Sequence, residues 1–215
     1  ASCCLGTMTA DEFSTVVESD VPVVAERGMS WDRVTGYGSH ATAGAAAPAT
    51  EWYFAEGATI SGLQLFYLFS NPGATPATVD VEYLLASGSA VTRQYTVPAR
   101  SRRTIWVNRE GAPLDAAEIA ARIISSQPIV AERATYLDRS GQPFAAGSAS
   151  AGVTSPATEW RFAEGATGPF FDTFLLLANP GASTVDVQAT FQRPDGVTVQ
   201  KTYPVPARTR RTVWV

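Results

Sequence analysis

A ten-residue stretch that occurs twice constrains the fold of this chain more than any other feature. It reads TEWYFAEGAT at residues 50–59, and residues 158–167 repeat it with one substitution, Arg161 in place of Tyr53. Further matches follow in the same order on both sides of it. Self-similarity at a fixed spacing is the signature of a repeated structural unit. The 215 residues therefore predict two units of about 100 residues each rather than one large domain.

The pattern of apolar residues predicts that these units are built from β-strands. Short runs rich in β-branched and aromatic residues alternate with clusters of Pro, Gly, Asn and Ser, which is typical of antiparallel strands joined by turns. Residues 79–83, Val-Asp-Val-Glu-Tyr, place apolar and acidic side chains on opposite faces. In the first unit we expect strands near residues 13–18, 21–31, 50–55, 62–70, 77–86, 90–97 and 102–107. This is the strand number of a small sandwich.

The spacing between the copies indicates that strand faces are preserved. It is 106 or 108 residues, and it changes by two residues at a time within turn-rich stretches. A change of two residues keeps inward-facing side chains inward, whereas a change of one would reverse the following strand. The landmarks are Pro22 and Pro128 (128 − 22 = 106), Glu51 and Glu159 (159 − 51 = 108), Asn71 and Asn179 (179 − 71 = 108), Thr78 and Thr184 (184 − 78 = 106), and Val97 and Val205 (205 − 97 = 108).

The most economical division of the chain gives two complete modules. A tail at 1–12 precedes a first module at 13–107, a linker at 108–118 and a second module at 119–215. The expected fold class is all-β, with two tandem immunoglobulin-like antiparallel β-sandwich modules of about seven strands each. A helical turn is expected near residues 114–121. An alternative division starts each unit at Thr50 and treats 1–49 as the end of a preceding unit, since a strand can be supplied across a module boundary.

Two pairs of adjacent charged residues recur between the copies. They are Glu26 with Arg27 and Glu132 with Arg133. Neighbouring residues on a strand point to opposite faces, so the members of a pair cannot readily bind each other. We expect partners on adjacent strands, such as an acidic residue of the repeated motif or an arginine near residue 100. These residues are interpreted as structural ion pairs rather than catalytic groups.

The repeated motif also places aromatic and acidic side chains on one face of a strand. Trp52 and Glu56 share a face in the first copy, as do Trp160 and Glu164 in the second. These four are candidate ligand or interface residues, because an indole can stack on a sugar ring while a carboxylate accepts hydrogen bonds. We favour packing of the indoles between sheets. A calcium site would need more oxygen ligands than this strand supplies, so no metal or other cofactor is expected.

The basic residues argue against nucleic acid as a partner. The net charge is −4, and Lys201 is the only lysine. The arginines gather in short clusters rather than on one continuous basic face. An acidic surface polymer could bind these clusters, but arginine on an edge strand also prevents edge-to-edge pairing. The clusters are Arg100, Arg102 and Arg103, and Arg208, Arg210 and Arg211.

The sequence does not favour an enzyme. His40 is the only histidine, and it lies in a loop rich in Gly, Ser and Ala whose counterpart has no histidine, so a Ser-His-Asp or Cys-His site has no support from the repeat. Cys3 and Cys4 are adjacent, and neighbouring cysteines rarely bridge each other, so we interpret them as free, paired between chains, or linked to an upstream segment. No apolar run approaches the roughly 20 residues of a membrane-spanning helix.

Three recurring patterns together resemble the repeat modules of large secreted or surface-anchored bacterial proteins. They are Trp-x-Phe-Ala-Glu-Gly, a strand ending in Asn-Pro-Gly, and Pro-x-Val-Ala-Glu-Arg, and the resemblance covers nearly all of residues 13–215. It implies an extracellular or cell-surface spacer, stalk or adhesive surface without catalytic residues. Expected partners are other copies of the chain, neighbouring modules and surface polysaccharide. The leading hypothesis is a stalk or filament subunit, assembled by strand exchange between chains; the alternative is a carbohydrate-binding module that uses Trp52 and Trp160.

Overall fold

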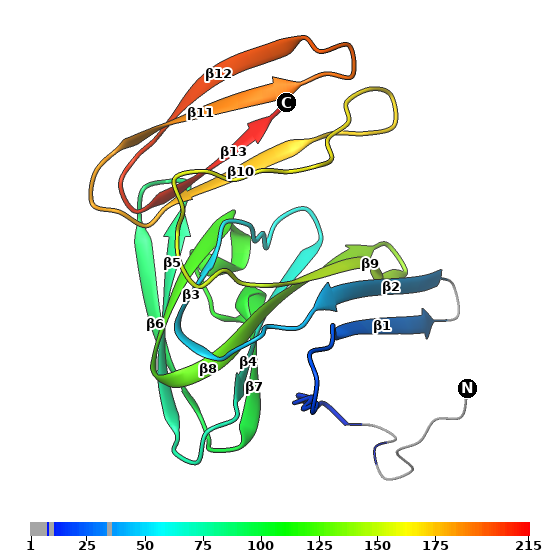
Figure 1. The fold of residues 1–215 in the computed structure, drawn as a ribbon, viewed down its shortest axis with the longest axis vertical. Coiled ribbons are helices and arrows are strands. Elements are labelled where there is room, and N and C mark those ends of the chain that lie inside the picture. Colours follow the sequence, from blue (N-terminus) through cyan, green and yellow to red (C-terminus); the bar gives the residue numbers. More distant parts are fainter. Residues whose placement is uncertain (1–7, 9–10, 34–35) are drawn as a thin grey trace.

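The computed structural model describes residues 8, 11–33 and 36–215, and it is built almost entirely from antiparallel strands (Figure 1). The expected all-β antiparallel fold is confirmed. Cys3 and Cys4, like most of the predicted tail at 1–12, lie outside the described residues. Among those that are described, no helix is long and apolar enough to cross a membrane.

Seven consecutive strands form one complete sandwich between residues 49 and 151. They pair in the order β6-β5-β8-β4-β7, with β3 and β9 also paired to β8. The strands are β3 (Ala49–Phe54), β4 (Leu63–Asn71), β5 (Ala77–Leu85), β6 (Ala90–Val97), β7 (Ser101–Trp106), β8 (Ile119–Arg139) and β9 (Gln142–Ala151). These are not the seven strands expected from the sequence: residues 13–25 contain no strand, β1 (Glu26–Arg33) pairs only with β2, and β8 and β9 take the two remaining places in the sheets.

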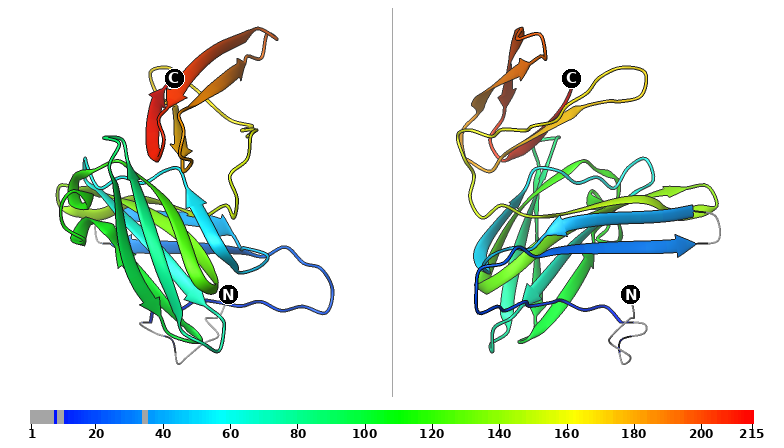
Figure 2. Two further views of the ribbon diagram at one scale, coloured as in Figure 1. Left: turned by 90° about the vertical axis from the view of Figure 1, so that its left-hand side faces the viewer. Right: turned by 45° about the vertical axis from the view of Figure 1, so that its right-hand side comes forward.

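The long strand β8 joins the two layers of this sandwich. Its first half pairs with β5 and β3, and its second half pairs with β4 and β9. The change of partner falls around Pro128, where the backbone has no N–H to donate to a ladder. One layer is thus β6-β5-β8-β3 and the other is β7-β4-β8-β9 (Figure 2).

Aromatic side chains from both layers meet in the core. The ring of Tyr67 on β4 lies 5.3 Å from that of Phe54 on β3 and 6.1 Å from that of Tyr83 on β5, measured between centroids. The Tyr83 and Tyr95 hydroxyls share a hydrogen bond of 3.0 Å, which satisfies both inside the core. The indole of Trp52 donates to the carbonyl of Ile129 on β8 at 3.0 Å. Strand β8 therefore completes both the sheets and the core.

A hairpin of β1 (Glu26–Arg33) and β2 (Gly36–Ala43) packs on the outside of β8 and β9. The Trp31 indole donates to the carbonyl of Phe144 at 2.7 Å, and His40 Nε2 lies 3.1 Å from the hydroxyl of Tyr136. The prediction that His40 lies in a loop is wrong, because the Gly-rich and Ala-rich stretch around it forms β2. Strand β9 has the same composition and was not predicted either. Such residues have low β-propensity, so only pairing with a neighbour reveals the strand.

The C-terminal part of the chain forms two separate ribbons of two strands each. Strand β10 (Phe174–Asn179) pairs with β13 (Thr209–Trp214), and β11 (Val185–Gln192) pairs with β12 (Thr198–Val205). These four strands are the counterparts of β4, β7, β5 and β6. In this second copy, residues 154–173 contain no strand.

The pairing register shows that this counterpart relation holds at a constant shift of 108 residues. Val79 pairs with Tyr95 in the first copy, and Val187 pairs with Tyr203 in the second. Gly88 and Gly196 both occupy the turn with positive φ, at 87° and 81°. Residues 78–81, Thr-Val-Asp-Val, therefore correspond in structure to residues 186–189, although the same four letters recur two positions earlier, at 184–187. A shift of two residues is tolerated because it keeps inward-facing side chains on the inward face of the strand.

Strand pairing follows the division in which each unit begins near Thr50. Residues 119–139, expected to open the second module, lie within the sheets of residues 49–151. The segment 108–118 connects β7 to β8 inside that sandwich through two short 3-10 turns, Val107–Arg109 and Leu114–Ala116. The helical turn expected near 114–121 ends at Ala116 because β8 begins at Ile119.

Candidate functional site

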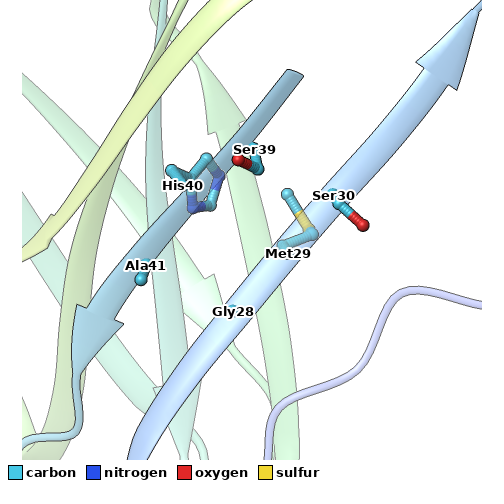
Figure 3. Close-up of a pocket in the computed structure, with 6 residues that line it drawn as sticks. All are labelled: Gly28, Met29, Ser30, Ser39, His40 and Ala41. Atoms are coloured by element: carbon cyan, nitrogen blue, oxygen red, sulfur yellow. The ribbon is translucent and has the colours of Figure 1, made fainter. Parts of the chain in front are cut away.

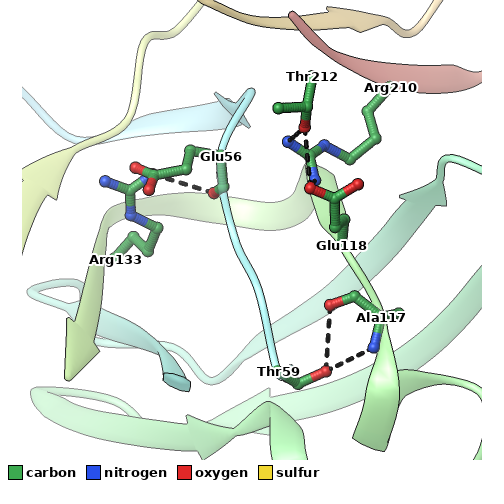
Figure 4. Close-up of polar contacts among 7 residues, drawn as sticks. All are labelled: Glu56, Thr59, Ala117, Glu118, Arg133, Arg210 and Thr212. Atoms are coloured by element: carbon green, nitrogen blue, oxygen red, sulfur yellow. Dashed lines mark hydrogen bonds and ion pairs between the residues drawn. The ribbon is translucent and has the colours of Figure 1, made fainter. Parts of the chain in front are cut away.

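An ion pair with a buried arginine joins the complete sandwich to the C-terminal ribbons (Figure 4). Arg210 on β13 has a side chain only 2% exposed, and its Nη1 lies 3.4 Å from Glu118 Oε1, just before β8. Arg210 Nη2 donates to Thr212 Oγ1 at 2.9 Å, and Thr212 donates to the same Glu118 oxygen at 2.9 Å. The three side chains form a closed triangle that ties β13 to the start of β8.

Nearby carboxylates favour the charged form of the Arg210 guanidinium. Burial lowers the pKa of this guanidinium, while Glu118 and then Glu56 act to raise it. A second pair lies close by: Arg133 Nη1 is 2.7 Å from Glu56 Oε2 and donates to the Glu56 carbonyl at 3.0 Å. Buried charges persist in proteins when they are paired and hydrogen-bonded in this way. The junction is therefore a specific polar contact in which the arginine is buried and the carboxylates of Glu118 and Glu56 remain partly exposed.

The same triangle occurs a second time, one repeat earlier in the chain. Arg102 on β7 pairs with Glu12 and donates to Thr104 Oγ1 at 2.7 Å. Thr104 donates to Glu12 at 3.2 Å, and the hydrogen bond from Arg102 is the largest cause that lowers the pKa of Glu12. Arg102 and Thr104 correspond to Arg210 and Thr212 at a shift of 108 positions. Glu12 corresponds to Glu118 at a shift of 106 positions. The chain therefore builds one kind of junction twice.

The recurring charged pairs bind partners on neighbouring elements. Arg27 Nη1 lies 2.7 Å from Glu132 Oε2, which links β1 to the outside of β8. Arg133 binds Glu56 of the repeated motif, as described above. Glu26 is exposed. Each interaction connects two structural elements, as ion pairs with a structural role do.

The two copies of the repeated motif have opposite surroundings. Trp52 is 2% exposed and Phe54 5%, whereas their counterparts Trp160 and Phe162 are 54% and 74% exposed. In the first copy this segment is β3, which pairs with β8. In the second copy the counterpart of β8 is absent from the described residues, and the segment forms no strand. Glu164 is exposed, while Glu56 holds Arg133.

A pocket lies over the hairpin β1–β2 (Figure 3). It is lined by Gly28, Met29, Ser30, Ser39, His40 and Ala41. Burial lowers the pKa of His40, whose ring lies beside that of Trp31, tilted by 58° with the centroids 5.6 Å apart. No cluster of three or more His, Cys, Asp or Glu side chains suited to a metal ion occurs in the described part of the chain. The pocket is a surface of the hairpin and gathers no set of reactive groups.

Sequence reasoning did not identify the junction residues Glu12, Glu118 and Arg210 as a set. A signal was available, because each glutamate directly precedes the first apolar residue of a recurring strand, Phe13 or Ile119. The partners are about 90 positions away in the chain, and only the fold brings them together.

Comparisons with known proteins give a limited result. No family model matches the chain, and no curated protein matches it. Among solved structures, it is similar to Thermotoga maritima 1070, with 14% identity over 50% of this chain and 96% of that one and a TM-score of 0.46. It is also similar to the Anabaena sensory rhodopsin transducer, with 26% identity over 41% of this chain and 83% of that one and a TM-score of 0.36.

Proposed function

We propose that this chain is a non-catalytic structural or adhesive repeat protein, acting as a stalk segment or filament subunit outside the cell. The observation that carries the proposal is the recurrence of the Glu-Arg-Thr triangle at Glu12 and at Glu118. In repeat proteins each unit contacts mainly its neighbours, and stability includes a term for every interface. A junction rebuilt at each period would hold successive units in a fixed relation.

Burial at the junction supports a mechanical role. The Arg210 side chain is almost fully enclosed, and removing one partner of a buried pair leaves the other charge uncompensated. Arrangements of the two units that break this contact are therefore less stable. A linker that allowed free motion would place its charges in solvent instead.

The chemistry of the perturbed groups supports a non-catalytic role. The strongest effects are on Tyr67, Tyr83 and Tyr95, whose pKa values are raised chiefly by burial. These three residues are core residues rather than groups in a cleft. An extracellular location follows from the resemblance to surface-protein repeats and is part of the same proposal.

Carbohydrate binding is the second candidate, and the exposed indole of Trp160 is the observation that favours it. The same position in the complete unit, Trp52, is buried in the core, where its indole donates to the Ile129 carbonyl, and it cannot stack on a sugar without opening the core. Binding of the protein to an immobilised panel of surface polysaccharides, if it is lost in Trp160→Ala, would favour the carbohydrate-binding module.

Small-angle scattering of the protein tests the proposed role. Arg210→Ala is expected to broaden the distribution of shapes, because Glu118 then loses its partner. Arg211→Ala is the matched control, since the Arg211 guanidinium lies over the Tyr203 ring and donates to Pro204 within its own ribbon pair. Equal flexibility of the parent protein and Arg210→Ala would contradict a fixed junction and with it the stalk function.

A further inference from the structure

A second ion pair joins the ribbons to the complete sandwich, on the outer face of β5. Arg208, in the turn between β12 and β13, binds the carboxylate of Glu82 through its Nη2. The Glu82 side chain is only 11% exposed, although it points away from the sandwich core. Its register partner on β8 is Arg122, whose guanidinium binds Glu51. The Glu82 carboxylate is therefore enclosed at the junction with Arg208 as its partner.

The surface beside Glu82 is apolar and covered. Leu84 and Ala120 are register partners on the same outer face, at the end of β5 and the start of β8. Both are buried, yet neither belongs to the cluster of described residues that fills the sandwich core. Strand β13 lies against β5 and β8. The ribbons thus dock on an apolar patch that carries two carboxylates, Glu82 and Glu118.

The turn that supplies Arg208 has the same sequence and conformation in both copies. It reads Pro-Ala-Arg and ends at Arg100 in the first copy and at Arg208 in the second. Both arginines have a positive φ, at 50° and 54°, which is uncommon for residues other than glycine. Their backbone N–H groups donate to the carbonyls of Gly73 and Gly181, each at 3.0 Å. The arginine side of the contact is therefore conserved between the copies.

The carboxylate side of the contact differs between the copies. Glu82 pairs with Thr92 across β5 and β6, and its structural counterpart is Thr190, which pairs with Gln200 across β11 and β12. The Thr190 hydroxyl accepts a hydrogen bond from Gln200 Nε2 at 3.3 Å. A hydroxyl carries no charge to balance a guanidinium. The two copies thus present the same arginine turn but different surfaces for receiving one.

We propose that the residue at the position of Glu82 determines which unit receives a neighbour at this junction. A unit with a carboxylate there accepts the Pro-Ala-Arg turn of its neighbour, and a unit with threonine there, as at Thr190, does not form the contact. The partner is a unit of the same kind, recognised by the arginine of its turn. This inference rests on the proposed structural function and names the residue that gives the junction its specificity.

The two ion pairs at the junction have different roles. The triangle around Arg210 recurs around Arg102, so it is common to both copies and cannot distinguish one unit from another. The Arg208 side chain is 57% exposed and is solvated without its partner, whereas the enclosed Glu82 carboxylate needs a cation. Specificity arises from such mismatches, because a wrong pairing leaves a buried charge without its partner.

A double-substitution cycle in the full chain tests this assignment. Arg208→Gln removes the cation, and Glu82→Thr copies the residue found at position 190. Hydrogen exchange of the β13 amides reports how often the ribbons leave the sandwich. We expect each substitution to accelerate this exchange about tenfold. The variant with both changes should exchange no faster than Arg208→Gln alone, because the same contact is lost only once.

Arg100→Gln is the matched control. It makes the same change at the same φ in the other copy of the turn, so exchange at β13 should stay as in the parent protein. Glu82→Gln keeps the length of the side chain and removes its charge, and it should act as Glu82→Thr does. It keeps the test decisive if threonine disturbs strand packing. Thermal melts followed by circular dichroism check that the sandwich of each variant is folded.

The outcomes separate this inference from the proposed function. Faster exchange in Arg208→Gln and in both Glu82 variants, with no further gain in the double variant, supports it. Additive effects of the two changes, or an equal effect of Arg100→Gln, overturn it. Faster exchange in Arg210→Ala but not in Arg208→Gln or Glu82→Thr overturns the specificity role and leaves the fixed junction standing. If none of these three variants exchanges faster than the parent protein, the fixed junction and this inference are both wrong.

Discussion

Trp52 and Trp160 hold the same position in two copies of one motif, yet 2% of the first side chain is exposed and 54% of the second. The difference comes from β8, whose residue Ile123 pairs with Trp52 and whose Ile129 carbonyl accepts the indole hydrogen bond. One chain thus contains the same local sequence with and without its strand partner. The comparison shows that tertiary pairing, rather than local propensity, makes this motif a strand.

Truncation of the two tryptophans should have unequal effects on stability. Trp52→Ala is expected to lower the free energy of unfolding by about 3 to 5 kcal/mol, because it leaves a cavity between the layers. Trp160→Ala should change it by less than about 1 kcal/mol in dilute protein, since the side chain is mostly in solvent. Chemical denaturation followed by far-UV circular dichroism measures both. Equal losses would show that Trp160 is buried in solution.

The glycine of the repeated motif should matter in one copy only. A Cβ at Gly57 would lie 2.8 Å from Leu65 Cδ2 and 3.0 Å from the carbonyl oxygen of Ile119. Gly57→Ala should therefore destabilise the sandwich by roughly 1 to 3 kcal/mol through overpacking. Gly165→Ala is the matched control, because the nearest atom to its Cβ would be Thr173 Cγ2 at 3.9 Å. Melting temperatures of the two variants would test the contrast, and a stable Gly57→Ala protein would contradict the packing seen here.

Acidification should loosen the hairpin β1–β2 from the sandwich. Burial lowers the pKa of His40, so the packed hairpin favours the neutral ring. Stability from this contact is present above the ordinary histidine pKa and is lost as the pH falls through the lowered value. Hydrogen exchange of the β2 amides, measured between about pH 7.5 and pH 5 and corrected for intrinsic rates, should show this loss of protection. His40→Gln should remove most of the pH dependence; an unchanged profile in that variant would assign the effect to other groups.

Loss of the Glu118 carboxylate should show how much the Glu118–Arg210 junction contributes to the stability of the protein. Glu118→Gln keeps the size of the side chain but leaves the guanidinium of Arg210 without its nearest countercharge, so we expect a loss of about 3 kcal/mol in the free energy of unfolding of the ribbons. Glu12→Gln alters the matching junction, where Glu12 is largely exposed, and should have a much smaller effect. Urea denaturation of the two variants measures the difference. Equal effects would contradict the burial of Arg210.

Much of the strand content could be predicted from the sequence, because residues 50–107 carry clear alternation and turn residues. The predicted strands near 62–70, 77–86 and 90–97 match β4, β5 and β6 within one residue at each end. The contact of Arg133 with Glu56 is one of the two kinds of partner that the sequence left open for the recurring charged pairs. These features depend on local patterns that a single sequence displays.

The phase of the repeat could not be predicted, because a period of 106 to 108 residues is the same wherever the unit begins. Only the pairing of β8 with β3, β4 and β5 decides that residues 119–139 close the sandwich that starts at Ala49. Residues 13–18 have the composition of a strand, but they pair with no strand in the part of the chain that the structure describes. A sequence that favours a strand forms one only where a neighbouring strand edge is available for pairing.

The distance between the complete sandwich and the ribbons tests the central claim, a fixed junction at Glu118 and Arg210, most directly. Spin labels are attached at Thr92→Cys on β6 and Thr202→Cys on β12, two exposed positions, in a background with Cys3→Ser and Cys4→Ser. The distribution of distances between the labels should be narrow, and it should broaden in Arg210→Ala but not in Arg211→Ala. A broad distribution in the parent protein, or one that Arg210→Ala leaves unchanged, would contradict a fixed junction.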